Sequence, residues 1–372
     1  MTKGEVVMNS MSFEDIMRQM QQQVQQESVI FGADPNNPFK LTVENEKAIF
    51  GRELNAIERN MLQTIMKVDN YSWQRGKTGG LKTGFDLFDE GLEGGLQPGL
   101  LLFAAQPNVG KSAFMLQIGK NVSRLNENVH VAYFSLDDSL NELMPRWIAC
   151  DQRIKISQAK NPERFMDDPA IMEKRNEGLK NLYRSIDRFS MYDTSTVDNS
   201  VESIEDKIKE LLMTLPEGTK LVIMIDSFHD LISREKEFGD NSKALHEYTA
   251  KYIKNWCTTY DAVVCCTAHL RKVNGNKRPD NADLKETNRL EYEANWIGMM
   301  YNEVGVKEES AQVYWLHEDS EEKMPVLEVR FAKNKFGSFK GTRFYEFWPD
   351  QSYAMEATIE DCRRYSSLIH QA

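Results

Sequence analysis

The sequence predicts an α/β fold in which a mostly parallel central sheet is flanked by helices, with a short helical N-terminal extension. Strand and helix patterns alternate from about residue 81, as they do in a parallel sheet covered on both faces. The segment Ala105–Ser112, Ala-Gln-Pro-Asn-Val-Gly-Lys-Ser, differs from the phosphate-binding loop pattern G-x-x-x-x-G-K-[ST] only at its first residue. An apolar strand pattern precedes this segment and a helix pattern follows it, which is the context that the loop requires.

Composition and charge limit the classes of protein to consider. The chain has 372 residues, of which 41% are hydrophobic and 28% charged, so we expect a folded core rather than disorder. No apolar run approaches the roughly 20 residues of a membrane span, and the N-terminus has no apolar signal region. The five cysteines follow no metal or disulfide spacing. The net charge of −11 argues against a protein that coats nucleic acid, but it permits a local basic channel.

The sequence pattern divides the chain into four segments. Residues 1–70 predict a helical extension, with an amphipathic pattern from Phe13 to Val24 and a turn-rich break at 32–38. A second apolar stripe at 54–68 predicts a helix that could pack on its own core or dock on a neighbouring subunit. Residues 71–80 are predicted to be a linker, 81–350 the main domain, and 351–372 a C-terminal tail.

The main domain is expected to contain eight strands and four long helices, recognised by apolar runs and by helical periodicity. The strand candidates are 100–104, 129–135, 188–192, 220–225, 262–268, 296–301, 312–316 and 326–332, and the helix candidates are 111–125, 139–150, 200–214 and 243–258.

The phosphate-binding loop pattern at 105–112 predicts a nucleotide site with ATP and Mg²⁺ as cofactors. Gly110 lets backbone N–H groups turn toward phosphate oxygens, Lys111 neutralises the β- and γ-phosphates, and the Ser112 hydroxyl ligates Mg²⁺. The apolar strand 220–225 runs into Asp226, a carboxylate expected to hold the hydration shell of the same Mg²⁺. The residues predicted to contact the nucleotide are Gln106, Pro107, Asn108, Val109, Gly110, Lys111, Ser112 and Ala113.

A second carboxylate follows the strand 129–135, in Ser135-Leu-Asp137-Asp138. Asp137 at the end of such a strand could orient or deprotonate the attacking water. Alternatively, Asp137 or Asp138 could cap the helix expected at 139–150.

A series of motifs follows one order along the chain: Gly84–Asp89, Gly95–Gly99, Ala104–Ser112, Phe134–Asp137, Ile223–Asp226, Ala268–Leu270, Lys277–Pro279, Asp283–Glu286, Leu290–Asn295 and Ala332–Gly337. This order of motifs resembles the ATPase domain of DnaB-type replicative helicases. That family also commonly has Ala at the first position of the phosphate-binding loop. The resemblance implies a RecA-like fold and a ring of six subunits that uses ATP to translocate 5′→3′ on single-stranded DNA.

The same resemblance implies further expectations about partners. Bacterial members carry an N-terminal collar of about a hundred residues, whereas about 70 precede the core here, so the chain looks like a compact phage- or plasmid-type member. We therefore expect a cytoplasmic location in a bacterial or phage-infected cell, no membrane partner, and a primase or helicase loader as a possible partner.

Three catalytic positions depart from the family pattern. Asp137 replaces the family's catalytic Glu and is one methylene shorter, so its oxygen could lie about 1 Å from the ideal position. His269 replaces a Gln that senses the γ-phosphate, and its charge could vary near neutral pH. Lys335 replaces the arginine finger, while Lys333 is kept; lysine lacks the planar fork of arginine. The resemblance thus implies catalytic roles for Lys111, Asp137, Asp226, His269, Lys333 and Lys335.

A basic loop is the candidate DNA contact. Segment 271–289 has six basic and three acidic residues, and in helicases of the resembled fold such a loop faces the central channel, where basic residues neutralise phosphates without reading bases. A solvated surface loop is the alternative, both here and at the weaker candidate, loop 233–243. The expected DNA-binding residues are Arg271, Lys272, Lys277, Arg278, Lys285, Glu286 and Asn288, where Asn288 replaces a family Gly.

Two functions remain open from the sequence. The first is a ring helicase, in which Lys333 and Lys335 reach the ATP site of a neighbouring subunit. The second, motivated by Asp137, His269 and Lys335, is an ATP-gated DNA-binding assembly with slow hydrolysis that serves recombination, packaging or defence.

Overall fold

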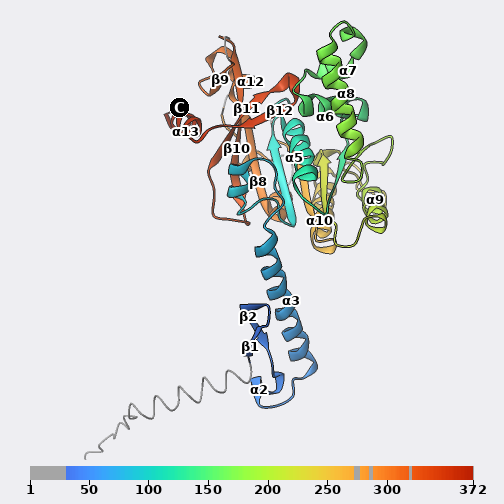
Figure 1. The fold of residues 1–372 in the computed structure, drawn as a ribbon, viewed down its shortest axis with the longest axis vertical. Helices are drawn as coiled ribbons and strands as arrows, with labels where there is room; N and C mark the ends of the chain where they lie inside the picture. The colour runs from blue at the N-terminus through green and yellow to red at the C-terminus, as the bar shows by residue number, and fades with distance from the viewer. Residues whose placement is uncertain (1–30, 272–276, 285–287, 318–320, 372) are drawn as a thin grey trace, which may run out of the picture. The chain divides into compact units, whose positions relative to one another are not determined.

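The computed structural model describes residues 31–271, 277–284, 288–317 and 321–371 (Figure 1). The chain divides into two compact units, Met1–Thr78 and Gly79–Ala372. The helix predicted between Phe13 and Val24 lies outside the described residues.

The N-terminal unit contains a β-hairpin. Strands β1 (Phe31–Asp34) and β2 (Asn37–Val43) pair antiparallel, and the turn is closed by the Asn36 N–H, which donates to the Asp34 carboxylate at 2.8 Å. The prediction of an all-helical extension is therefore wrong here, because the turn-rich break at 32–38 joins two short strands. The hairpin is followed by α2 (Glu46–Phe50).

Helix α3 (Ala56–Thr78) has 23 residues and contains the helix predicted at 54–68 from residue 56 onward. The predicted linker at 71–80 is wrong up to Thr78, because the helix continues until Gly79, which has the left-handed φ of +62° that commonly ends helices. Along α3, Ile57, Met61, Ile65 and Val68 are each at least 58% exposed.

The C-terminal unit is built on one large sheet with strand order β12-β11-β10-β8-β3-β7-β6-β4-β5. The strands from β5 to β8 in this order pair parallel, whereas β10, β11 and β12 extend the sheet antiparallel. The mostly parallel α/β fold is thus confirmed. The bounds are β3 (Gly99–Ala105), β4 (Val129–Ser135), β5 (Phe189–Asp193), β6 (Lys220–Asp226), β7 (Val263–His269), β8 (Trp296–Asn302), β9 (Tyr314–Leu316, paired with β10), β10 (Lys323–Asn334), β11 (Thr342–Trp348) and β12 (Tyr353–Glu356).

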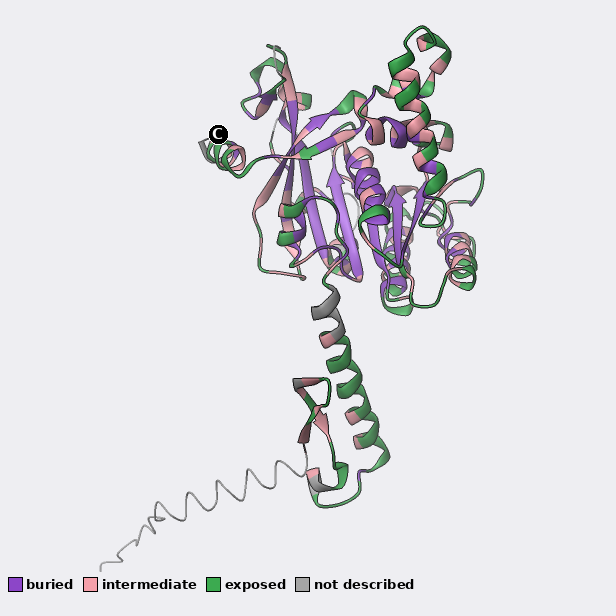
Figure 2. Cartoon of the chain, in the orientation of Figure 1, coloured by how far each residue is buried: buried purple, intermediate pink, exposed green. Residues whose placement is uncertain are grey.

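The central strands are apolar on both faces because helices cover both sides of the sheet (Figure 2). On one face Leu101 and Phe103 of β3 pack with residues of α5 (Lys111–Leu125) and α6 (Leu140–Gln152). On the other face Leu100 and Leu102 pack with residues of α9 (Val201–Thr214) and α10 (Ser242–Thr259). These helices were predicted within two residues of their ends.

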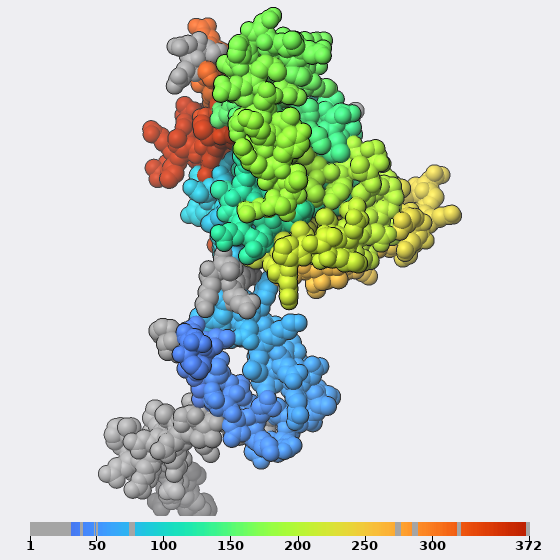
Figure 3. Space-filling view, turned by 45° about the vertical axis from the view of Figure 1, so that its right-hand side comes forward, coloured from blue at the N-terminus to red at the C-terminus, as the bar shows by residue number. Residues whose placement is uncertain are grey.

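Several shorter or more polar helices were not predicted. Helix α8 buries only Gly178 and Leu182, so its apolar stripe is sparse. Figure 3 shows the surface that α7 and α8 (green) and α9 (yellow-green) form on this unit. The bounds are α4 (Asp86–Gly91), α5 (Lys111–Leu125), α6 (Leu140–Gln152), α7 (Ile156–Lys160), α8 (Pro169–Arg184), α9 (Val201–Thr214), α10 (Ser242–Thr259), α11 (Asn288–Glu293), α12 (Glu303–Lys307) and α13 (Ile359–Gln371).

Residues 351–372 were predicted to be a tail, which is wrong for the part that the structure describes. Strand β12 pairs with β11 from Trp348↔Tyr353 to Tyr345↔Glu356. Helix α13 then packs Tyr365, fully buried, into a cluster with Trp315 and Trp348. The segment is therefore part of the domain.

Among the described residues, no helix is both long enough and apolar enough to cross a membrane.

Candidate nucleotide-binding site

The site lies at the carboxyl end of the central strand β3. Strand β3 has β7 on one side and β8 on the other, and ligands of open α/β sheets bind in the crevice at the carboxyl ends of such strands. A cleft of about 390 Å³ opens there. Its walls are Pro107, Asn108, Gly110, Lys111, Ser112, Ala113, Asp137, Asp138, Arg146, Ile156, Asp226, Ser227, His269, Phe347, Pro349 and Ser352.

The loop needs no glycine at its first position. Ala105 is the last residue of β3, is fully buried, and pairs in parallel register with His269 of β7. The positive φ values occur later, at Asn108 (+63°) and Gly110 (+114°). At Gly110 a Cβ atom would also lie 3.0 Å from the Phe347 ring, so glycine is required there for both conformation and space.

Lys111 is the first residue of α5 and is only 7% exposed. Its Nζ donates to the carbonyl oxygens of Ala105 at 3.2 Å and Gln106 at 3.0 Å. Burial lowers the pKa of this ammonium to about 8, although the carboxylates of Asp226 and Asp137 act in the opposite direction. The charge is therefore held inside the loop, at the place where an anionic ligand would compensate it.

Asp226 is oriented by two hydroxyl groups from neighbouring strands. Its Oδ2 accepts from the Tyr133 hydroxyl at 2.9 Å, and its Oδ1 accepts from the Thr267 hydroxyl at 2.5 Å. Burial raises the pKa of Tyr133 well above its usual value, so this phenol donates as a neutral group. Ser112 lines the same cleft. A serine hydroxyl and one carboxylate fit Mg²⁺, which usually takes one or two protein oxygens in addition to ligand phosphates and water.

Asp137 is an exposed residue of this cleft. The alternative prediction, that Asp137 or Asp138 caps the following helix, is wrong. The N-cap of α6 is Ser139, and the Leu140 N–H donates to Asp193 at 2.9 Å. Asp138 instead forms an ion pair with Arg146, so the two adjacent carboxylates have different environments.

Asp137 reaches the cleft from a strand that is not adjacent to β3, because β7 and β6 lie between β3 and β4. The loop after β4 nevertheless reaches the cleft, because the parallel strands β4, β6, β7 and β3 all end at the same edge.

His269 ends β7, opposite Ala105. Its Nε2 lies 3.3 Å from the Ser227 hydroxyl, and its backbone N–H donates to His229 Nδ1 at 3.2 Å. Because His229 Nδ1 accepts, the neutral His229 ring carries its proton on Nε2. The His229 ring lies 5.4 Å from that of His269 and 5.3 Å from that of His246 on α10.

Lys333 and Lys335 lie near the other end of the sheet. Lys333 Nζ donates to the carbonyls of Glu291 at 2.6 Å and Tyr292 at 3.1 Å. The Lys335 N–H donates to Asn295, whose own N–H donates to Leu100. Leu100 is five residues before Ala105, which is roughly 17 Å along a strand. Neither lysine is among the residues that line the cleft of its own chain.

Only part of the predicted DNA-binding set lies in described residues. Arg271 is exposed, and Lys277 has a side chain that is 68% exposed and forms an ion pair with Asp280 at 3.2 Å. Lys272, Lys285 and Glu286, and the side chain of Asn288, lie outside the described residues.

Arg278 differs from the exposed members of that set. Its guanidinium forms ion pairs with Glu328 at 2.7 Å and Glu303 at 3.0 Å. It therefore points into the protein, with its charge already compensated, and the prediction that it binds DNA is not supported.

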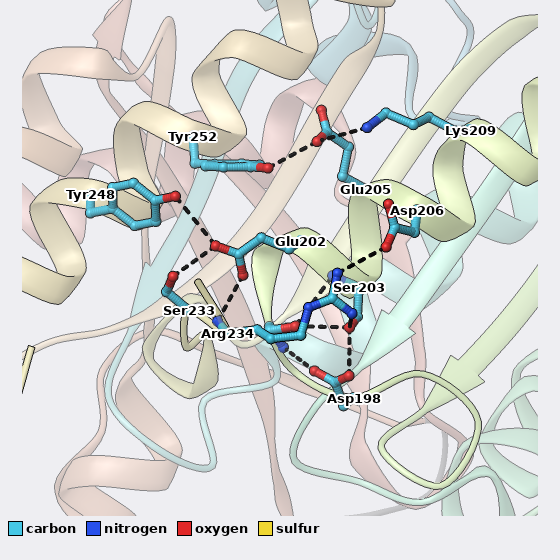
Figure 4. A network of polar contacts seen from close by, with 11 residues as sticks. Asp198, Glu202, Ser203, Glu205, Asp206, Lys209, Ser233, Arg234, Tyr248 and Tyr252 are labelled. Carbon is cyan, nitrogen blue, oxygen red and sulfur yellow. Dashed lines mark hydrogen bonds and ion pairs between the residues drawn. The ribbon is translucent and has the colours of Figure 1, made fainter. Parts of the chain in front are cut away.

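The first residues of the second candidate loop, 233–243, are held by hydrogen bonds to α9. Figure 4 shows Glu202 of α9 between Ser233, Arg234 and Tyr248. Its carboxylate accepts from the Ser233 hydroxyl at 2.7 Å, the Arg234 N–H at 2.9 Å and the Tyr248 hydroxyl at 3.3 Å. The Arg234 guanidinium pairs with Asp206 at 3.0 Å, so the loop offers less free positive charge than its sequence suggests.

Sequence reasoning missed one wall of the cleft. Phe347 lies near the end of β11, and Pro349 and Ser352 belong to the turn that leads into β12, a region in which no strand was predicted. No motif marks these residues, because their role depends on the antiparallel extension of the sheet.

Comparison with known proteins identifies similar chains. Residues 80–348 match the family model described as the DnaB-like helicase C-terminal domain. The chain is 25% identical over 281 residues to the replicative DNA helicase DnaB of Geobacillus stearothermophilus, an alignment that covers 74% of this chain and 57% of that protein. The chain thus spans about half the length of the curated relatives it matches.

Two solved structures share the fold. One is a structure of an ATPase domain, which superposes with a TM-score of 0.67 at 22% identity and covers 82% of this chain and 100% of that one. The other is a DnaB-like replicative helicase, described together with its interactions with primase. It superposes with a TM-score of 0.65 at 21% identity, covering 93% of this chain and 76% of that one. The C-terminal unit therefore has the RecA-like fold expected from the motifs.

Proposed function

The chain belongs to the family of DnaB-like helicase C-terminal domains, and we propose that it acts as an ATP-driven ring helicase that translocates 5′→3′ on single-stranded DNA and unwinds duplex DNA in replication. The observation that carries this proposal is the convergence of Lys111, Ser112, Asp226, Asp137 and His269 on one cleft at the end of β3.

The residues of the cleft fit distinct tasks in phosphate transfer. ATP with Mg²⁺ supplies the phosphoanhydride bond and the cation that neutralises its oxygens. Gly110 and Lys111 hold the phosphates, while Ser112 and Asp226 provide the oxygens for the cation. Asp137 accepts a proton from the attacking water, and the His269 ring donates a hydrogen bond to the terminal phosphate. Tyr133 and Thr267 keep Asp226 in position.

The proposal includes a homo-oligomer, with six subunits in a ring. Lys333 and Lys335 lie near the end of the sheet away from their own cleft, so they would serve the cleft of the next subunit. The exposed apolar residues of α3 are suited to contact a neighbouring copy.

Single-stranded DNA is the proposed partner of Arg271 and Lys277, together with Lys272, Lys285, Glu286 and Asn288. Phosphate neutralisation by basic side chains gives affinity without sequence preference and weakens as salt rises. A primase is a further proposed partner, since one similar structure describes a DnaB-like helicase and its interactions with primase.

The test is the steady-state ATPase rate of the full chain with and without a poly-dT oligonucleotide, at low and moderate salt. We expect DNA to stimulate the rate, the stimulation to fade with salt, and Lys111→Ala to abolish turnover. Ordinary hydrolysis by Lys111→Ala would refute the assignment of the cleft. Tight nucleotide binding with little turnover, whether or not DNA is present, would instead indicate the ATP-gated assembly.

A further inference from the structure

Two adjacent basic residues of the candidate DNA segment have opposite environments. The side chain of Lys277 is 68% exposed, whereas that of Arg278 is 23% exposed and lies against buried carboxylates. Sequence alone treats these two residues as equivalent phosphate contacts, but the structure separates them.

Arg278 makes a two-pronged contact with Glu328 of β10. Its Nε donates to one carboxylate oxygen at 2.7 Å and its Nη2 to the other at 2.8 Å. Nη2 also donates to Glu303 of α12 at 3.0 Å. The side chains of Glu328 and Glu303 are 4% and 1% exposed, so a cation must accompany them.

The positive and negative charges around Arg278 balance one another. Lys307 pairs with the second oxygen of Glu303 at 2.6 Å, giving two cations for two carboxylates. Burial raises the pKa of Glu328 even beside Arg278. Burial also acts to raise the pKa of Glu303, but Lys307 and Arg278 lower it below its usual value. The guanidinium further lies 5.0 Å from the centre of the Tyr301 ring of β8.

The rest of the described segment is held at two places. Arg330 of β10 donates to the Pro279 carbonyl at 2.8 Å. At the other end, the Arg271 N–H donates to the Asp283 carbonyl at 2.8 Å, and Leu270 and Leu284 form a β-bridge just after β7. Arg278 is thus the charged centre of the attachment that joins the start of residues 277–284 to β8 and β10.

We propose that Arg278 is a positioning residue that, through Glu328 and Glu303, holds residues 277–284 on the sheet so that Lys277 is presented to the DNA backbone. This inference rests on the proposed function, since it assigns how the DNA-binding segment is held. Prepositioning removes the cost of ordering the segment when DNA binds.

The opposing hypothesis is that Arg278 leaves the cluster and contacts a phosphate. The two hypotheses give opposite signs for one substitution. If Arg278 is a phosphate contact, Glu328→Gln frees the guanidinium and strengthens DNA binding. If Arg278 is a positioning residue, Glu328→Gln loosens the segment and weakens DNA binding.

The first experiment measures binding of a fluorescein-labelled poly-dT oligonucleotide by anisotropy, over a series of salt concentrations, with a non-hydrolysable ATP analogue present. The variants are Lys277→Gln, Arg278→Gln, Glu328→Gln and the double variant Arg278→Gln/Glu328→Gln. Nucleotide affinity, measured with a fluorescent ATP analogue, is expected to be unchanged in Glu328→Gln, because this residue does not line the cleft.

We expect Arg278→Gln and Glu328→Gln each to weaken DNA binding about tenfold, the size expected when one more residue must be ordered on binding. The double variant should be no weaker than either single variant, because the two residues act as one unit. The salt dependence should keep its slope in these variants, since the phosphate contacts still form. Lys277→Gln should instead reduce the slope by about 0.7, the value for one phosphate contact on a single strand.

A second readout does not depend on DNA. Hydrogen exchange of a peptide that covers residues 277–284 should be faster in both Arg278→Gln and Glu328→Gln than in the wild type, and unchanged in Lys277→Gln. Tighter DNA binding by Glu328→Gln, a reduced salt slope in Arg278→Gln, or unchanged exchange in Glu328→Gln would each overturn the positioning role. If the wild-type chain does not bind the oligonucleotide, the proposed function fails, and the exchange measurement still decides whether Arg278 holds the segment.

Discussion

The Lys111 ammonium is buried in the loop beside β3, and burial lowers its pKa to about 8. In the free protein it loses its proton as the pH rises through this value. A bound polyanion favours the charged form, so the pKa is higher in the complex. Nucleotide binding therefore takes up a proton above about pH 8, and affinity falls by up to about tenfold for each further pH unit.

Calorimetric titration of an ATP analogue between pH 6.5 and 9.5 checks this prediction. We expect constant affinity below about pH 7, and a binding enthalpy that depends on the buffer at pH 8.5 because a proton is taken up. Lys111→Ala should bind weakly and lack this pH dependence. Constant affinity of the wild type across the whole range would contradict the prediction.

Asp137 and Asp138 provide a matched pair within the cleft. Asp137 is exposed to the cleft, whereas Asp138 pairs with Arg146. If Asp137 is the general base, Asp137→Asn should lower kcat by roughly 10²- to 10⁴-fold and leave nucleotide affinity within about twofold. Asp138→Asn should retain at least about a tenth of the turnover. An equal loss in the two variants would show that charge in the cleft, rather than a base at 137, sets the rate.

Glutamate at position 137 tests whether the shorter side chain limits the rate. In this structure the loop after β4 is fixed by the Leu136 N–H, which donates to the Asp226 carbonyl at 2.6 Å. Because the loop cannot shift freely, the extra methylene of Asp137→Glu would move the carboxylate, and we expect a change in kcat with little change in nucleotide affinity. A gain would show that the natural chain is tuned for slow hydrolysis.

A site residue can be predicted from the sequence when the features that place it lie close to it in the chain. Lys111, Ser112, Asp226 and His269 follow strand ends or lie in the loop, so the pattern of the chain placed them in one cleft correctly. Phe347 joins the cleft only because β10, β11 and β12 extend the sheet antiparallel. The pairing of Arg278 with Glu328 could not be predicted, because the two residues are fifty positions apart in the chain and no local pattern connects them.

At the scale of elements, buried strands and long amphipathic helices were predictable because their apolar periodicity is strong. Helix α5 was predicted with both ends correct, since the loop fixes its start. The four-residue strand β12 and helix α13 were missed. Their position depends on Tyr365, which packs against distant residues rather than against its chain neighbours.

Helix α13 should accordingly contribute to the stability of the C-terminal unit. Tyr365 is fully buried among Phe344, Trp348 and Trp315, so Tyr365→Ala should destabilise this unit by about 3–5 kcal/mol. Ser367→Ala, at an exposed position of the same helix, should change stability by less than about 0.5 kcal/mol. Urea unfolding followed by tryptophan fluorescence measures both, because Trp315 and Trp348 report on this cluster. Equal unfolding midpoints for Tyr365→Ala and the wild type would mean that α13 does not belong to the cooperative unit.

At the scale of the whole molecule, the register of the sheet separates two halves of the proposed ATP site. The loop lies at the carboxyl end of β3, whereas the hydrogen bonds from Lys335 to Asn295 and from Asn295 to Leu100 place Lys335 at its amino end. Within one chain, the two parts therefore lie at opposite ends of the sheet. A head-to-tail interface, which brings different surfaces of two subunits together, can complete the site.

Mixing two inactive variants tests this arrangement. Lys111→Ala removes the loop cation but keeps Lys335, and Lys335→Ala does the reverse. If sites form between subunits, each variant alone should be nearly inactive. A 1:1 mixture that has exchanged subunits should regain up to about a quarter of the DNA-stimulated ATPase rate, since random neighbours restore one site in four.

Mixtures of each variant with Asp226→Ala provide the control. Asp226→Ala should rescue Lys335→Ala but not Lys111→Ala, because Asp226 and Lys111 line the same cleft. Full activity of Lys335→Ala alone, or no recovery in the mixture despite subunit exchange measured by mass photometry, would show that each cleft works without a neighbouring lysine.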